Sequence, residues 1–107
     1  MSTPAEFFTK KNEQIKASPG ALAGVNATYQ FNLTGDNGGE WVIKLGGDDS
    51  GVMDGTNDAA DCVISMSDSD FMGIISGSLN PQMAFMTGKL RVKGDMGLAL
   101  KLQTILS

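Results

Sequence analysis

Residues 27–34 read Ala27-Thr28-Tyr29-Gln30-Phe31-Asn32-Leu33-Thr34, and apolar and polar side chains alternate along the whole stretch. Successive side chains of a β-strand point to opposite faces, so this stretch predicts a strand with one covered face and one polar face. Two glycine-rich turns separate it from two further strands, which predicts an antiparallel meander, and a fourth strand follows. The predicted strands are residues 27–34, 40–46, 52–53 and 61–66.

A helix is expected before these strands. Residues 3–6, Thr-Pro-Ala-Glu, predict its start, with threonine as the N-cap, proline first and glutamate third. The helix should run to about Lys16, with Phe8, Asn12 and Ile15 along one stripe. Because this stripe is short and only partly apolar, we expect the helix to pack against a larger element.

Three helices and one more strand are expected in the second half of the chain. Start signals mark each of these helices, and the last is apolar nearly all round. Ser67-Asp68-Ser69-Asp70 is typical of a capped helix start, Asn80-Pro81 opens the next helix, and Asp95 caps the last; the helices end at Gly77, Gly88 and Leu106. Residues 89–93 alternate as a strand, with Leu90 and Val92 inward. This order of elements predicts an α+β fold.

The composition limits the class of protein. The chain has 107 residues, a net charge of −4 and a pI of about 4.5, with 41% hydrophobic and 19% charged residues. The length predicts a single domain, residues 1–107, of the soluble globular class. The acidic balance argues against nucleic acid as a partner, and we expect a monomer. No stretch approaches the roughly 20 apolar residues that cross a bilayer, and the first residues do not resemble a secretory signal.

Catalytic and metal chemistry is disfavoured. The chain has no histidine, which excludes Ser-His and Cys-His nucleophiles and most catalytic zinc sites, and its single cysteine is Cys62. Asp54, Thr56 and Asp58 have the spacing of a calcium loop, but Ala59 and Ser65 stand where glycine and glutamate are needed. We therefore expect no catalytic residue, no metal site and no cofactor.

The apolar residues of the second half exceed what a single buried stripe requires. Helices near 71–86 and 96–106 carry most of them, and the chain has seven methionines. One interpretation is an ordinary core in which methionine fills irregular space. The other is an apolar cavity between helices and sheet that holds a lipid-like ligand. A third is an interaction module whose apolar last helix docks a partner protein or a second copy of the chain.

Two ordered motifs resemble one family. Residues 60–71 read Ala60-Asp61-Cys62-Val63-Ile64-Ser65-Met66-Ser67-Asp68-Ser69-Asp70-Phe71, and Gly77 and Asn80-Pro81-Gln82-Met83-Ala84-Phe85 follow. Together with residues 88–102 they are similar to the sterol carrier protein 2 domain. The resemblance implies a five-stranded, mainly antiparallel sheet covered on one face by helices, with an apolar tunnel between the layers. It also implies non-catalytic binding and transfer of fatty acids, fatty acyl-CoA, sterols or similar lipids.

The expected tunnel residues come from the apolar positions of the second half. They are Phe71, Ile74, Ile75, Leu79, Met83, Phe85, Met86, Leu98, Leu102 and Ile105. The candidates for contact with a polar headgroup are Gln82, Lys89, Arg91 and Lys93.

Positive charge is concentrated near the end of the chain. Residues 71–107 carry four basic side chains and one acidic one, whereas residues 17–70 carry nine acidic side chains and one basic one. Lys89, Arg91 and Lys93 alternate and are expected to share one face of their strand. Two interpretations are open. The charges either keep an exposed strand soluble or attract an anionic headgroup or membrane in transient contact.

The last residues bear on localisation. The chain ends Thr104-Ile105-Leu106-Ser107, without a Ser-Lys-Leu type peroxisomal address. The expectation is a cytoplasmic protein, or a peroxisomal one if the chain is a fragment of a longer eukaryotic protein.

Overall fold

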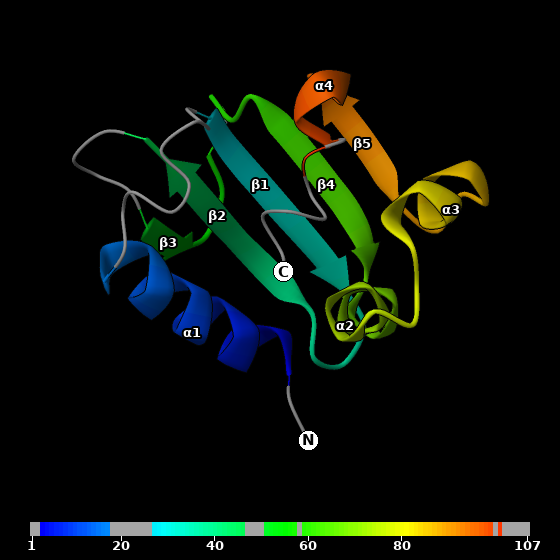
Figure 1. Cartoon of the computed structure of the whole chain (residues 1–107), viewed down its shortest axis with the longest axis horizontal. Coiled ribbons are helices and arrows are strands. Elements are labelled where there is room, and N and C mark those ends of the chain that lie inside the picture. Colours follow the sequence, from blue (N-terminus) through cyan, green and yellow to red (C-terminus); the bar gives the residue numbers. More distant parts are fainter. Residues whose placement is uncertain (1–2, 18–26, 47–50, 58, 100, 102–107) are drawn as a thin grey trace.

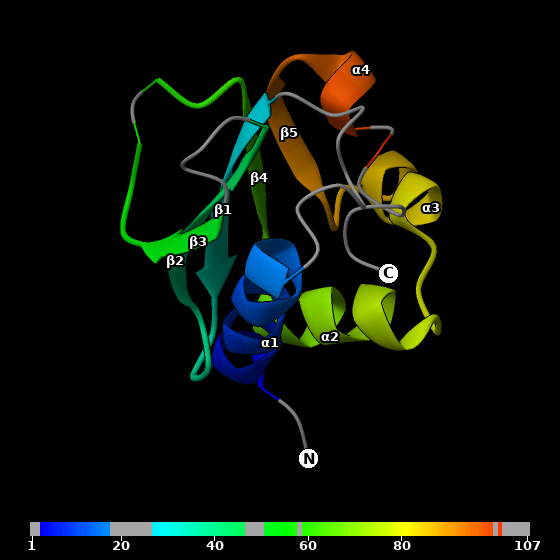
Figure 2. The same cartoon turned by 60° about the vertical axis from the view of Figure 1, so that its left-hand side comes forward.

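The computed structural model of the chain describes residues 3–17, 27–46, 51–57, 59–99 and 101. These residues form two layers, a sheet with helices on one face (Figures 1 and 2). In chain order the elements are α1 (Pro4–Ala17), β1 (Ala27–Thr34), β2 (Gly39–Leu45), β3 (Gly51–Asp54), β4 (Cys62–Ser67), α2 (Asp68–Ser76), α3 (Pro81–Met86), β5 (Arg91–Gly94) and α4 (Met96–Ala99).

The sheet has the strand order β3-β2-β1-β4-β5 (Figure 1). The predicted meander is confirmed for β1, β2 and β3, which pair antiparallel. The next strand does not extend it: β4 returns to the other side of β1 and pairs with it in parallel, and β5 then pairs antiparallel with β4. The sheet is therefore mixed but mainly antiparallel, as predicted, with β1 at its centre.

The connection from β3 to β4 lies on the side of the sheet away from the helices (Figure 2). Gln30 of β1 is buried against it at 3% exposure. Its Nε2 donates to the Gly55 carbonyl at 3.0 Å, and its Oε1 accepts the Asn57 N–H at 2.6 Å. At the end of the connection, the Asp61 carboxylate accepts the Thr28 N–H at 2.9 Å. The polar face of β1 is therefore covered in part, because Gln30 satisfies the backbone groups of this connection.

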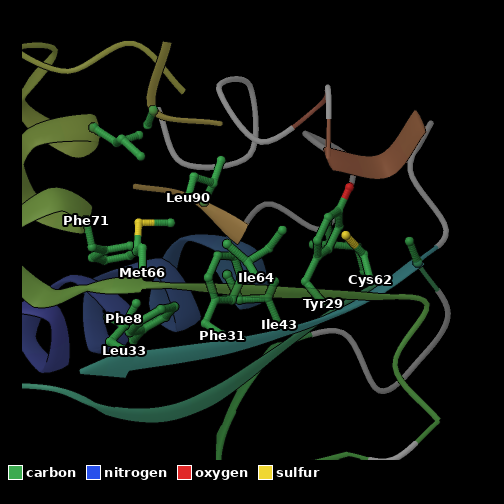
Figure 3. Packing of buried hydrophobic residues seen from close by; sticks show 14 of the residues in the cluster. Phe8, Tyr29, Phe31, Leu33, Ile43, Cys62, Ile64, Met66, Phe71 and Leu90 are labelled. Atoms are coloured by element: carbon green, nitrogen blue, oxygen red, sulfur yellow. The ribbon is translucent and has the colours of Figure 1, made fainter. Parts of the chain in front are cut away.

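The other face of the sheet carries the core (Figure 3). Aromatic rings join α1 and α2 to it: Phe8 stacks on Trp41 with ring centroids 4.7 Å apart and on Phe71 at 5.2 Å. The alternation along β1 supplies buried residues on this face, as predicted. The buried cluster comprises Phe8, Ile15, Ala27, Tyr29, Phe31, Leu33, Ile43, Leu45, Cys62, Ile64, Met66, Phe71, Ile74, Ala84 and Leu90.

The helices begin at the predicted starts, and each first turn is capped by a side chain. The Glu6 N–H donates to Thr3 Oγ1 at 3.3 Å, and Glu6 Oε2 accepts the Thr3 N–H at 3.2 Å. Ser67 Oγ accepts the Asp70 N–H at 3.1 Å at the start of α2, and Asn80 caps α3. Side-chain oxygens thus satisfy N–H groups that the first turn of a helix leaves unpaired.

The buried stripe of α1 differs from the predicted one at a single position. Phe8 and Ile15 are buried as expected, and Asn12 is half-buried. Asn12 Oδ1 accepts the Val52 N–H at 2.9 Å and so ties α1 to β3. Lys11 completes the buried stripe instead, with 5% exposure.

The last helix begins where the sequence predicts. The Asp95 carboxylate accepts the Gly97 N–H at 2.8 Å in the first turn of α4. Most of the remainder of this predicted helix, towards Leu106, lies outside the described residues. Among the helices of the described ranges, none has the length and apolar character needed to cross a membrane.

Candidate functional site

An apolar pocket of about 250 Å³ lies between α3, β5 and α4. Helices α3 and α4 both lie beside β5, at the edge of the sheet (Figure 1). The pocket is lined by Pro81, Gln82, Phe85, Met86, Leu90, Val92, Met96 and Ala99.

The turn between α3 and β5 builds the inner wall of this pocket. The carbonyl of Ala84, a fully buried residue, accepts the N–H groups of Lys89 at 2.9 Å and Leu90 at 3.0 Å. These bonds fold the chain back across the end of α3 and bury Leu90. Val92 pairs with the buried Ile64 and so points to the helix-covered face of the sheet. Leu90 and Val92 therefore face inward, as the alternation predicts.

The outer side of the pocket is open to water. Phe85 is 43% exposed, Met86 78% and Met96 46%. Met83, on the same helix as Phe85, is 55% exposed. Large apolar side chains in water are costly, so this group marks the pocket mouth as a surface for a ligand or partner.

Tyr29 connects α4 to the sheet. Its hydroxyl donates to the Leu98 carbonyl at 2.8 Å, and Figure 3 shows the ring rising from β1 towards α4. Burial, with smaller contributions from Cys62, Asp95 and Asp61, raises the pKa of this hydroxyl well above its usual value. The hydroxyl therefore stays protonated and remains a donor.

Cys62, beside Tyr29, carries a fully buried thiol. Burial, followed by the charges of Asp95 and Asp61, raises the pKa of the Cys62 thiol to about 11. A thiol with a raised pKa is a poor nucleophile, so Cys62 serves packing. Within the described residues, no group of three or more His, Cys, Asp or Glu side chains could hold a metal ion.

Several of the predicted ligand residues meet at the pocket. Gln82, Phe85 and Met86 line it, and Met83 lies on the same helix. Leu98 packs partly buried against the core beside it. Leu102 and Ile105 lie outside the described residues.

Other predicted ligand residues lie elsewhere. Phe71 is completely buried among aromatic rings, and Ile74 is buried beside it in the same cluster. Leu79 packs partly buried against that cluster. Ile75 lines a separate hollow of about 540 Å³ beside α2.

That second hollow is larger but more polar. Its lining includes Asn37, Asp68, Ser69, Ser76 and Ser78. The Asp68 carboxylate is already engaged, since it accepts the N–H groups of Asn37 at 3.0 Å and Ser69 at 2.8 Å. We therefore place the candidate site in the smaller, apolar pocket.

The basic candidates do not line the pocket. β5 begins at Arg91, so Lys89 lies in the turn before the strand and not within it. Arg91 and Lys93 alternate with Val92 and so point to the face away from the helices, where they share a face as predicted. Gln82 is thus the polar candidate that reaches the pocket.

The pocket also uses residues that were not expected to meet a ligand. Pro81, Met96 and Ala99 line it together with Leu90 and Val92. The alternation around Leu90 and Val92 was the available signal, since it marks both as inward. The alternation does not indicate whether Leu90 and Val92 line a pocket or pack against other side chains.

Comparison with known proteins relates the chain to one family. Residues 8–107 match the SCP-2 sterol transfer family. A relative from Xenopus laevis, hydroxysteroid dehydrogenase-like protein 2, is 47% identical over 87 residues, which are 80% of this chain and 21% of that protein. The chain thus spans about a fifth of the length of this curated relative.

Solved structures share the fold. Sterol carrier protein 2 from Yarrowia lipolytica, in its apo form, has a TM-score of 0.80 and 29% identity, covering 94% of this chain and 87% of that one. Palmitated SCP2L2 from Aedes aegypti has a TM-score of 0.71 and 25% identity, covering 98% of this chain and 95% of that one.

Proposed function

Since the chain belongs to the SCP-2 sterol transfer family, we propose that it binds the apolar part of a lipid in the pocket between α3, β5 and α4 and carries it through water. The observation that carries this proposal is an apolar pocket whose mouth is lined by the exposed side chains of Phe85, Met86 and Met96. A bound acyl chain would cover these side chains and would itself leave water.

The free energy gained by burying an acyl chain is sufficient for binding. Each buried methylene contributes about 0.8 kcal/mol, so a 16-carbon chain offers on the order of 10 kcal/mol before ordering and association costs. The pocket volume of about 250 Å³ is below the roughly 300–1,000 Å³ of typical ligand sites. It therefore takes one segment of a long chain, and the rest extends beyond the residues that line it.

The proposed ligands are fatty acids, fatty acyl-CoA, sterols or similar lipids. Support comes from the family and from the palmitated protein of Aedes aegypti that has the same fold. Apolar walls discriminate weakly between chain lengths, by about 1–3 kcal/mol per methylene, so we expect broad tolerance. Gln82 is the polar side chain in the lining that can bond a headgroup.

We propose that binding occurs without catalysis. The Cys62 thiol is buried with a raised pKa. The relatives named hydroxysteroid dehydrogenase-like protein 2 are several times longer than this chain. In them, we assign lipid binding to the matched part and any oxidoreductase chemistry to the remainder.

A pocket-filling variant tests the proposal. Ala99→Phe places a ring in the pocket and should weaken binding of a fluorescent fatty acid by about tenfold, equal to about 1.4 kcal/mol. Ala5→Phe, at an exposed position of α1, is the matched control and should bind as the parent protein does. Thermal unfolding of both variants reports whether the fold is preserved.

Native mass spectrometry of the purified protein gives a second readout. A monomer carrying co-purified lipid is the expected species. An empty dimer, together with equal fatty-acid affinity for the Ala99→Phe and parent proteins, would contradict the proposal. That result would favour an interaction module that docks a second copy.

A further inference from the structure

The methionines of the described residues differ widely in exposure. Met53, Met83, Met86 and Met96 have exposed side chains, at 46% to 78%, whereas Met66 in the core is 5% exposed. Of the four exposed ones, Met86 and Met96 also line the apolar pocket. Met86 comes from α3 and Met96 from α4, the two helices beside β5 (Figure 1). A lipid in the pocket and a small solute in water can therefore reach the same two thioethers.

A thioether that is open to water reacts with peroxides. A lone pair of the sulfur attacks one oxygen of hydrogen peroxide, so that an S–O bond forms while the O–O bond breaks. The hydroxide that leaves takes the proton of the transferred hydroxyl group and departs as water. The sulfur is oxidised by two electrons, and the peroxide is reduced by the same two. The product, methionine sulfoxide, is polar where the parent side chain was apolar.

We propose that Met86 and Met96 form a reversible oxidation site at which hydrogen peroxide weakens lipid binding. An acyl chain in the pocket covers the side chains that line it, so a sulfoxide oxygen there would lose its hydrogen bonds to water. Among the described lining residues, Gln82 alone carries a side-chain donor that could replace them. A polar group buried without a partner costs free energy, and that cost is subtracted from the affinity. The inference rests on the proposed function and adds regulation of the same pocket to it.

The remaining sulfur atoms of the described residues are poor competitors for peroxide. Cys62 is the single cysteine of the chain, and its side chain is completely buried. Burial raises the pKa of the Cys62 thiol to about 11, so the reactive thiolate is scarce at neutral pH. Met66 belongs to the buried cluster. Peroxide should therefore oxidise the exposed methionines first.

Protection by a ligand tests whether lipid and peroxide meet at the same atoms. The full chain is treated briefly with hydrogen peroxide, with and without palmitate below its micelle-forming concentration, and peptide mass spectrometry reports each methionine. Palmitate should slow oxidation of Met86 and Met96 severalfold and leave Met53 and Met83 unchanged. Met66 should stay unoxidised, which shows that the protein remains folded. Equal rates with and without palmitate at Met86 and Met96 would overturn the inference.

Titration with a fluorescent fatty acid before and after peroxide treatment measures the effect on binding. The parent protein should lose about tenfold in affinity, as expected for a polar group that the ligand buries. Met86→Leu/Met96→Leu should keep its affinity, because leucine has a similar volume and is not oxidised. Met53→Leu/Met83→Leu, which removes two exposed methionines outside the pocket lining, is the matched control and should lose affinity as the parent does.

Reversal and a peroxide-free variant complete the test. Methionine sulfoxide reductases of both stereospecificities should restore the affinity, with a dithiol that becomes a disulfide while the sulfoxide oxygen leaves as water. Met86→Gln imitates the polar product and should weaken binding without peroxide, whereas Met83→Gln should not.

The outcomes separate this inference from the proposed function. An oxidised parent protein that binds fatty acid as before overturns the inference and leaves the proposed function standing. An equal loss in Met86→Leu/Met96→Leu and in the parent would also overturn it, because the effect would then arise outside the pocket. If the untreated parent protein binds no fatty acid, the proposed function and the inference both fail.

Discussion

Lys11 is a charged side chain buried in the core-facing stripe of α1. It is 5% exposed, and its Nζ lies 5.5 Å from the centroid of the Phe7 ring. The ring face attracts the ammonium, which offsets part of the cost of burial. Burial nevertheless lowers the pKa of Lys11 below its ordinary value. The amphipathic pattern of the sequence did not predict the burial of Lys11, because a lysine in a helix is usually assigned to the face that is exposed to solvent.

Replacing Lys11 by methionine should stabilise the protein at neutral pH, since no ammonium then has to leave water. In the parent protein, stability should rise as the pH passes through the lowered pKa of Lys11 towards the unfolded value of 10.5. In that window the native state releases a proton that the unfolded state keeps. Lys11→Met should lack this rise.

Chemical denaturation between neutral and alkaline pH measures both effects. The raised pKa values of Cys62 and Tyr29 act in the opposite direction at alkaline pH, so the difference between the two proteins isolates Lys11. A Lys11→Met protein that is less stable than the parent at neutral pH would show that the ammonium contributes net stability.

At the scale of elements, α4 is a short helix that the side chain of Tyr29 ties to the sheet. The Tyr29 hydroxyl donates to the Leu98 carbonyl, and Leu98 and Ala99 pack partly buried on the core. Ala99 also lines the pocket, so the position of α4 sets the pocket width.

Tyr29→Phe removes this bond and keeps the ring. We expect a loss of about 1 kcal/mol in the free energy of unfolding, the usual contribution of one hydrogen bond. Amide hydrogen exchange at residues 98 and 99 should accelerate more than exchange in β1, because α4 loses its tie to the sheet. Uniform acceleration across the molecule would instead mean that α4 and the sheet open as one unit.

The sequence predicts where elements begin and end better than how they assemble. Thr3, Ser67 and Asn80 act within one helical turn of themselves, so local pattern is enough to place α1, α2 and α3. The pairing of β4 with β1 depends on the path of the connection between β3 and β4, to which Gln30 is hydrogen-bonded. The alternation of apolar and polar residues along a strand does not indicate which strand will be its neighbour.

For the candidate site, too, the sequence predicted the local pattern but not the three-dimensional assembly. Periodicity marks Phe71 and Phe85 alike as residues that prefer to leave water. Phe71 meets other aromatic rings and Phe85 borders an open pocket, a difference that only packing in three dimensions decides. Arg91 and Lys93 share a strand face, but which side of the sheet that face occupies follows from pairing with β4.

At the scale of the whole molecule, the fold and the binding site draw on different parts of the chain. The five paired strands with α1 and α2 contain nearly all of the buried cluster. The pocket depends on α4, because Met96 and Ala99 form one of its sides.

Deleting Met96 to Ser107 should therefore leave a folded but less stable protein that no longer binds a fluorescent fatty acid. Circular dichroism and thermal unfolding establish whether the sheet persists, and a titration measures the affinity. A folded truncated protein with unchanged affinity would show that α4 is not a wall of the site.

The parallel pairing of β1 with β4 has a consequence for how the chain folds. Thr28 of β1 and Asp61 before β4 are hydrogen-bonded across 33 residues of chain, so the contact order of the central pair is high. Distant pairings of this kind form slowly, because loop-closure entropy is lost before the contacts are gained. During synthesis, a chain that has not yet reached β4 leaves one edge of its central strand without a partner, and that edge is open to other chains until residues 62–67 emerge.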